Sequence, residues 1–267
     1  MFSSVPESQR DSAAVVKSLL VMAVTVVDDV ADKLHDGALL NELLRLLEPG
    51  LYRDMIDTNS RHPATSLTAT LLEAVFSRLN QAPNWDAIRP YFHFDLKQVW
   101  NAFGYSYLTN THPHFINFTE SKAYHGHNMM FLVFGDIDLA YSQMIAEHEI
   151  GAMREAMWTA QQMARIGNWV STWERELNER DYSSGVVSLA LSQGILTTFE
   201  LQDSGQTDAM IERLRQSGVE QQLFDQWVVL GRSLIGMQDQ ISSVSIPDYV
   251  AGIEFLMIHH LSSRGLK

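Results

Sequence analysis

Two rows of oxygen-bearing side chains are the part of this sequence best suited to chemistry. The first row is Asp28, Asp29 and Asp32, and the second row is Asn168, Thr172 and Glu176. Residues four apart share one face of a helix, with Cβ atoms roughly 5–6 Å apart, so Asp28 and Asp32 point the same way, as does the whole second row. Oxygen ligands suit hard cations such as Mg²⁺, which usually lies between carboxylates and a phosphate-bearing substrate. Two such rows facing each other would therefore hold Mg²⁺ ions.

Each row also has a plainer explanation. The acids would form a solvated helix end, although negative charge near a helix C-terminus is unfavourable by roughly a few tenths of a kcal/mol per exposed acid. The second row would be an ordinary amphipathic stripe, although Asn and Thr are mediocre helix formers. Its neighbours are apolar or aromatic, and a polar row in such surroundings needs partners or ions. The two rows together favour a metal site more strongly than either row alone.

The order and spacing of the two rows resemble the paired metal signature of class I terpene synthases. In that family D-D-x-x-D near the end of one helix is followed, on a late helix, by N-x-x-x-[ST]-x-x-x-E. The matching residues are Asp28, Asp29 and Asp32 for the first motif, and Asn168, Thr172 and Glu176 for the second. The family usually has Asp directly after the Asn, where this chain has Trp169. The resemblance extends from about Val15 to Arg264.

Two basic residues extend the resemblance. The family keeps a basic diphosphate sensor roughly 46 residues before the Asn, and Lys122 stands there in place of the usual Arg. The family also tends to end with an Arg-Tyr pair that closes on the diphosphate, and this chain has Arg264 without the Tyr. Only 27 residues precede Asp28, fewer than in typical members, so the chain is either a shortened form or trimmed at its start.

The resemblance implies ionisation of a prenyl diphosphate and cyclisation of the resulting carbocation to a terpene hydrocarbon or alcohol. Three Mg²⁺ ions would neutralise the diphosphate and act as Lewis acids on the leaving group. The expected metal ligands are Asp28, Asp32, Asn168, Thr172 and Glu176, and the expected catalytic residues are Asp28, Asp29, Asp32, Lys122 and Arg264. Expected substrate contacts are Lys122, Arg165 and Arg264 at the diphosphate, with Trp100, Phe103, Phe131 and Trp158 at the carbocation, since aromatic faces stabilise cations.

The expected substrate has twenty carbons, linear or bicyclic, because the stretch from Glu174 to Gly185 is similar to that of small bacterial diterpene cyclases. A fifteen-carbon substrate is an alternative. A second alternative is a chain-elongating prenyl diphosphate synthase, which would need an Asp-rich motif where Asn168, Thr172 and Glu176 stand. A third is a helical binding domain without catalysis, in which the acids are a solvated face.

Composition restricts the function classes. The chain has 267 residues, 46% of them hydrophobic, no cysteine, a formal net charge of −13 and a pI near 5.1. An acidic surface argues against nucleic acid as a partner. The longest apolar run, 18–27, is too short to cross a bilayer. Without a cysteine or a signal-peptide pattern, we expect a cytoplasmic protein, with a homodimer left open.

Hydrophobic periodicity is helical nearly throughout and predicts a single all-α domain, a bundle with a core cavity. The expected helices are 13–33, 38–47, 66–79, 85–108 with Pro90 near its start or at a kink, 115–141 as one or two helices with a break near Gly135, 147–178, 186–199, 206–216, 221–241 and 248–263.

Overall fold

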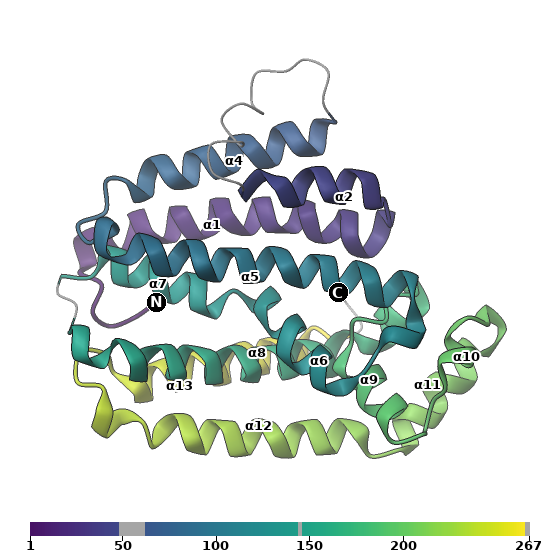
Figure 1. The fold of residues 1–267 in the computed structure, drawn as a ribbon. Coiled ribbons are helices and arrows are strands. Elements are labelled where there is room, and N and C mark those ends of the chain that lie inside the picture. Colours follow the sequence, from purple (N-terminus) through teal and green to yellow (C-terminus); the bar gives the residue numbers. More distant parts are fainter. Residues whose placement is uncertain (48–61, 144–145, 265–267) are drawn as a thin grey trace.

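The computed structural model describes residues 1–47, 62–143 and 146–264, and all regular structure in these ranges is helical (Figure 1). The predicted all-α class is therefore confirmed for the described chain. The helices are α1 (Glu7–Asp29), α2 (Gly37–Leu44), α4 (Pro63–Leu79), α5 (Trp85–Thr111), α6 (Phe118–Tyr124), α7 (Phe131–Tyr141), α8 (Ile150–Glu179), α9 (Gly185–Ser192), α10 (Thr198–Leu201), α11 (Thr207–Gln216), α12 (Val219–Ile235) and α13 (Ile246–Ser262). Short 3₁₀ helices cover Arg45–Leu47, Pro113–Phe115, His125–Met129, Glu147–Glu149, Ser204–Gln206 and Gln238–Gln240.

Helix α1 carries the first predicted row. Its buried residues, among them Val16, Leu20 and Val27, recur at spacings of three and four and pack against α4 and α7. The helix passes without a break into a π-helical turn, Val30–Leu34, which ends where His35 adopts a left-handed φ of 51°. Asp28 therefore lies in the last α-helical turn and Asp32 in the π turn. Single π turns often occur at functional sites.

Helix α8 carries the second row. It has 30 residues and contacts α7, α9, α11, α12 and α13, so that it crosses the middle of the molecule (Figure 1). From Gln161 to Gly167 every residue of α8 is buried, and further on Trp169, Val170 and Trp173 are buried as well. A polar residue in this part of α8 must therefore face either a neighbouring helix or an internal cavity.

Two predicted features of the helix pattern were wrong. The expected break near Gly135 falls at Met130, which has a left-handed φ of 58°, and α7 continues through Gly135. A Cβ on Gly135 would clash with the Met157 side chain of α8, so the glycine permits close packing and does not end a helix. The expected helix 186–199 ends at Ser192, and α10 begins afresh with a capping box between Thr197 and Glu200.

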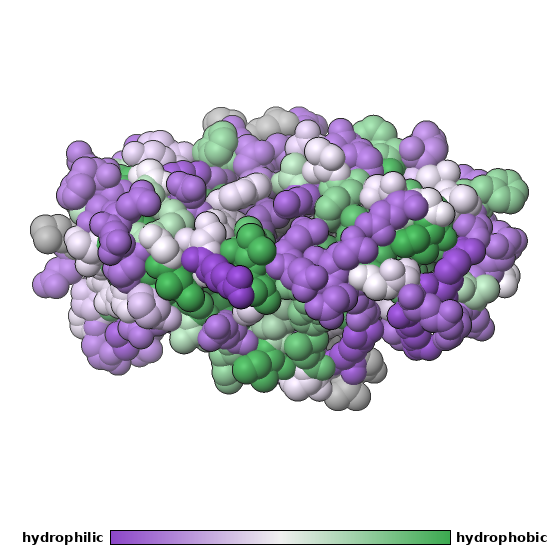
Figure 2. Space-filling model, turned by 90° about the horizontal axis from the view of Figure 1, so that it is seen from below, coloured by the Kyte–Doolittle hydropathy of each residue, from purple (hydrophilic) through white to green (hydrophobic). Residues whose placement is uncertain are grey.

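The outer surface is mixed. In the described ranges, no helix is both long and apolar enough to cross a membrane. Helix α12 runs along the lower edge of Figure 1, and Figure 2 views the molecule from that side, with apolar side chains among hydrophilic ones. Large exposed apolar residues of α12 and α13 include Val228, Val229, Phe255 and Ile258.

Candidate functional site

A cavity of about 310 Å³ brings the two predicted rows together. Asp28 and Asp32 line it from the end of α1 and the π turn, and Asn168 and Glu176 line it from α8. These pairs are about 140 positions apart in sequence. Further lining residues include Val21, Val24, Met129 and Met130, which are apolar, and Asp181 and Ser183, which follow α8.

The acids of the first row divide between the cavity and the outer surface. Asp28 and Asp32 are half-buried and line the cavity. Asp29 does not line it, and its carboxylate instead pairs with the Lys33 ammonium at 2.7 Å near the surface. The i, i+4 spacing therefore places the two outer acids of the motif on one side, as predicted, and Asp29 on another.

Two residues of the second row, Asn168 and Glu176, line the cavity, and Thr172 does not. Asn168 Oδ1 accepts a hydrogen bond of 2.8 Å from the Arg165 guanidinium. The buried Thr172 hydroxyl donates to the Asn168 carbonyl oxygen at 2.8 Å. Glu176 is buried, yet its Oε2 has no hydrogen-bond partner. Its Oε1 lies 3.7 Å from the Arg175 guanidinium. Glu176 thus keeps a free oxygen in the wall of the cavity.

Two polar residues that the sequence analysis did not select belong to the same site. Asp181 is buried and lines the cavity. Asn110, at the end of α5, donates from Nδ2 to the carboxylates of both Asp32 and Asp181, at 3.3 and 3.2 Å. Asp181 could have been noticed as an acid five positions after Glu176, but no sequence signal distinguishes Asn110.

Crowding of carboxylates changes their protonation. Burial, and next the Asp181 carboxylate, raise the pKa of Asp28 to about 6 and that of Glu176 to about 8. The same two causes raise the pKa of Asp32 well above its usual range. Removing a charged carboxylate from water disfavours its ionised form, and a second carboxylate nearby adds repulsion. Without a bound cation, these raised pKa values favour the protonated, neutral form of the cavity's carboxyl groups.

Three cations also line the cavity: Lys33, Arg165 and Arg175. Arg165 is the buried one, with its guanidinium 5.3 Å from the centre of the Trp169 ring. Besides Asn168 it donates to the Ser183 carbonyl oxygen at 3.3 Å, while its Nε has no partner. Burial lowers the pKa of Arg165, and the surrounding acids oppose this shift. Arg165 is thus placed to meet an anion in the cavity.

Trp169 does not line the cavity and packs against α9 instead. It is buried, and its ring packs so closely on α9 that a Cβ at Gly185 would overlap it. Trp169 therefore serves packing between α8 and α9.

Two predicted basic residues do not line the cavity. Lys122 is exposed on α6. Arg264 follows α13 and forms ion pairs with Glu220 at 2.6 Å and Glu174 at 3.2 Å. Their proposed contacts with a diphosphate stay predictions that this conformation does not display.

The four predicted aromatic residues also lie outside the cavity lining. Trp100 is buried against Phe103, with its indole nitrogen donating to the Leu43 carbonyl oxygen at 3.1 Å. Phe131 lies 6.4 Å from Tyr249, between ring centres, and lines a different pocket between α7 and α13. Trp158 contacts His127, with ring centres 5.1 Å apart. In this conformation all four contribute to packing.

The donor types suit Mg²⁺, because carboxylate, amide and hydroxyl oxygens are its usual protein ligands. The unpartnered Glu176 oxygen and the excess of carboxylates fit a cation. Among the residues that the structure describes, however, no three His, Asp or Glu side chains gather closely enough to hold a metal ion. The ligands border one cavity without converging on one point, and Asn168 would first have to leave Arg165.

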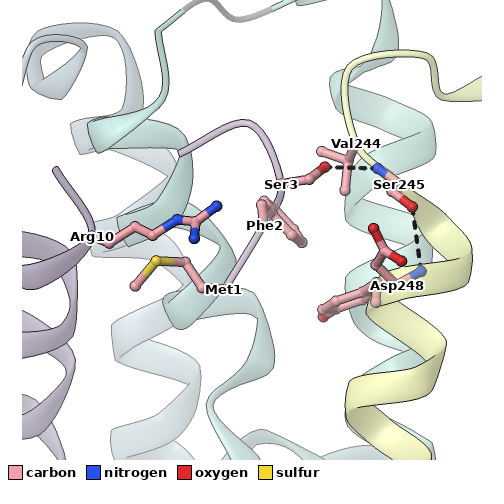
Figure 3. A pocket seen from close by; sticks show the side chains of 8 residues that line it. Met1, Phe2, Ser3, Arg10, Val244, Ser245 and Asp248 are labelled. Atoms are coloured by element: carbon pink, nitrogen blue, oxygen red, sulfur yellow. Dashed lines mark hydrogen bonds between the residues drawn. The ribbon is translucent and has the colours of Figure 1, made fainter. Parts of the chain in front are cut away.

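A second pocket lies at the opposite end of α1, where Met1, Phe2 and Ser3 meet Arg10 and the start of α13 (Figure 3). The Ser245 backbone N–H donates to Ser3 Oγ at 2.9 Å, and the Asp248 N–H donates to Ser245 Oγ at 3.3 Å. These bonds attach the first residues to α13 and cap that helix. None of the predicted site residues lies in this pocket.

Comparison with known proteins yields no family for the chain: no protein-family model matches it, and no curated protein does. The functional argument therefore depends on the cavity and its residues.

Proposed function

We propose that the protein is a Mg²⁺-dependent class I terpene synthase, with the helical fold of that class. The observation that supports this most is the meeting of two motifs, about 140 positions apart in sequence, at one cavity. An accidental D-D-x-x-D at a solvated helix end gives no reason for Asn168 and Glu176, two residues of the second motif, to line the same cavity as Asp28 and Asp32.

The residues that would hold Mg²⁺ are Asp28, Asp32, Asn168, Thr172 and Glu176. When bound, the ions neutralise a diphosphate and assist its departure as Lewis acids. Arg165 would donate charge-assisted hydrogen bonds to the diphosphate oxygens, which are stronger than those it makes to the uncharged oxygens of Asn168 and Ser183. Because Arg165 is buried and Lys122 is exposed, we assign Arg165 the principal role at the anion.

The hydrocarbon part of the substrate needs an apolar, dry surface, because water would quench a carbocation. Val21, Val24, Met129 and Met130 provide apolar surface beside the acids. We keep a twenty-carbon prenyl diphosphate as the proposed substrate, and a cyclic hydrocarbon or alcohol plus diphosphate as the products.

Incubation of the full chain with Mg²⁺ and prenyl diphosphates of ten to twenty-five carbons tests this function. Diphosphate release and the extracted organic products are measured together. Asp28→Asn and Glu176→Gln should each abolish release, whereas Asp86→Asn, which removes a highly exposed acid in the first turn of α5, should not. If no prenyl diphosphate is turned over by the unchanged chain, the proposal is wrong.

Adding isopentenyl diphosphate to the same assay separates cyclisation from chain elongation. A longer prenyl diphosphate product would identify a prenyl diphosphate synthase instead. A helical binding domain would show neither product, and its thermal stability would not respond to Mg²⁺ with inorganic pyrophosphate, because a ligand raises stability only if it binds the folded state.

A further inference from the structure

We propose that Asp181 is a further acidic residue of the cation site, and that Asn110 positions it against Asp32. The inference rests on the proposed divalent-cation site, although its test needs no prenyl substrate. Neither residue belongs to the two motifs that the sequence analysis matched.

The turn after α8 brings Asp181 to the cavity. Helix α8 ends where Arg180 adopts a left-handed φ of 61°, which reverses the chain. The Asp181 N–H then donates to the Glu176 carbonyl oxygen at 2.8 Å. The Asp181 carboxylate in turn accepts from the Ser183 N–H at 2.9 Å, which fixes the orientation of the side chain. A buried acid is thus held beside the last residue of the second row.

Asn110 connects this acid to the first row. Its Nδ2 donates to Asp32 Oδ1 and to Asp181 Oδ1, and its Oδ1 accepts from the Tyr182 N–H at 2.7 Å. One side chain on α5 therefore uses both its donor nitrogen and its acceptor oxygen to hold the π turn and the loop after α8 together. The two carboxylate oxygens share a single amide nitrogen, so they are close neighbours across the cavity.

The Asn110 side-chain amide donates hydrogen bonds to Asp32 and Asp181 but carries no charge that would compensate theirs. In the described chain, neither Asp32 nor Asp181 has an ion pair: Lys33 pairs with Asp29, and Arg165 donates to the uncharged oxygens of Asn168 and Ser183. Arg175 pairs with Glu179 and lies 3.7 Å from one oxygen of Glu176. Buried charges ordinarily need an opposite charge or a metal.

Glu176 gives the independent indication of a ligand. Its side chain is 9% exposed, and its Oε2 has no partner although it borders the same space. Unpartnered buried oxygens are uncommon and require an explanation such as an ion. In this structure the three acids border one cavity without gathering around a point, so a divalent cation would draw Glu176, Asp32 and Asp181 closer together and compensate all three.

Binding of Mn²⁺ to the full chain, measured by electron paramagnetic resonance without any diphosphate, tests the inference. Asp181→Asn keeps the shape and the hydrogen-bond acceptor and removes the charge, and it should weaken Mn²⁺ binding at least about tenfold, within the range for lost metal-site partners. Asp86→Asn is the control, because Asp86 is a highly exposed acid in the first turn of α5 that does not line the cavity. Equal affinities for the unchanged chain and Asp181→Asn, or no Mn²⁺ binding by the unchanged chain, would overturn the inference.

Asn110→Leu tests the positioning role. Outer partners of metal ligands typically contribute about 10–100-fold to metal affinity, so we expect a loss in that range. A merely structural role would lower metal-free thermal stability and leave the Mn²⁺ affinity of the folded protein unchanged, and that result would contradict the assignment. Far-UV circular dichroism checks that each variant folds.

These measurements also distinguish the two proposals. Mn²⁺ binding that depends on Asp181, in a protein that releases no diphosphate from any prenyl substrate, would retain the cation site and reject the terpene synthase.

Discussion

The Arg165 guanidinium donates to Asn168 Oδ1 at 2.8 Å, one helical turn away on α8. The buried guanidinium of Arg165 therefore occupies an oxygen that we propose as a metal ligand. Arg165 and a metal ion would compete for this oxygen, and each would also be attracted by the same surrounding carboxylates. Conversely, an anion that attracts the guanidinium would release Asn168, so anion and cation binding should support each other.

Replacing Arg165 should therefore affect cation and anion in opposite directions. Arg165→Met keeps much of the side-chain length but removes a positive charge beside the acids, so Mn²⁺ should bind at least about tenfold more tightly. Inorganic pyrophosphate should bind more weakly, because its charge-assisted donor is lost. Calorimetric titration with each ligand measures both effects. Arg215→Met is the control, since Arg215 pairs with Glu174 at the surface. Mn²⁺ affinity that stays constant or falls in Arg165→Met would show that the two cations do not compete.

The carboxylates predict how metal-free stability depends on pH. The pKa of Glu176 rises from 4.5 to about 8 and that of Asp28 from 3.8 to about 6, first through burial and then through Asp181. Between the unfolded and folded values, the folded state binds more protons than the unfolded state. The free energy of unfolding should therefore fall as pH rises through this window, by an amount on the order of a few kcal/mol.

Urea denaturation at about pH 5 and about pH 8 measures this fall. Glu176→Gln should make the curve flatter, because an amide does not titrate, and Asp86→Asn should leave it unchanged. Adding Mg²⁺ at the higher pH should recover part of the stability, since ions that bind the folded state stabilise it. A free energy of unfolding that increases over this pH range would show that folding does not raise the pKa values of Asp28 and Glu176.

The sequence was sufficient for the parts of the site that follow from helix periodicity. Asp28 and Asp32 share a side because the apolar pattern of α1 fixes its buried face, and the same holds for Asn168 and Glu176 on α8. The π turn was not predicted, because hydrophobic spacing over five residues does not distinguish it from an α-helical turn. The all-α class was predictable for the same reason, because it too follows from the helical spacing of apolar residues along the chain.

Residues whose role depends on tertiary contacts were not predictable. Asn110 acts on partners 78 and 71 positions away, and its own helix gives no indication of them. Asp181 reaches the cavity through a left-handed turn at Arg180, a residue with no glycine-like preference for that conformation. Lys122 was chosen by its distance along the chain from Asn168, which does not determine where the intervening turns place it.

A second buried charge cluster, away from the cavity, leads to a prediction about stability. Arg154 on α8 binds both oxygens of Asp95, at 2.7 and 2.9 Å, and lies 3.7 Å from Asp136. Burial, and next Asp95, raise the pKa of Asp136 well above its usual range. The raised pKa favours the neutral form of Asp136.

The two acids should respond differently to the same substitution. Asp95→Asn removes the charge that compensates Arg154 and should cost about 3 kcal/mol of unfolding free energy. Asp136→Asn replaces a neutral acid by a neutral amide and should change stability by less than about 1 kcal/mol. Urea denaturation near pH 7 compares the variants. Equal losses would mean that Asp136 is ionised and shares Arg154 with Asp95.

The Trp169 ring packs against Gly185 on one side, and the Arg165 guanidinium lies over the same ring. The contact between α8 and α9 therefore helps to position Arg165 at the cavity. A methyl group at Gly185 would overlap the ring, so Gly185→Ala should displace Trp169 and lower stability by about 1–3 kcal/mol. The displaced ring should carry Arg165 with it and weaken pyrophosphate binding, although neither Gly185 nor Trp169 lines the cavity.

Gly252→Ala is the matched control: a Cβ at this position in α13 meets no atom within 4 Å, so the variant should gain up to about 1 kcal/mol from better helix propensity. Thermal denaturation and pyrophosphate titration of both variants decide the point. A Gly185→Ala protein with reduced stability but unchanged pyrophosphate affinity would show that the α8–α9 contact stabilises the fold without positioning Arg165.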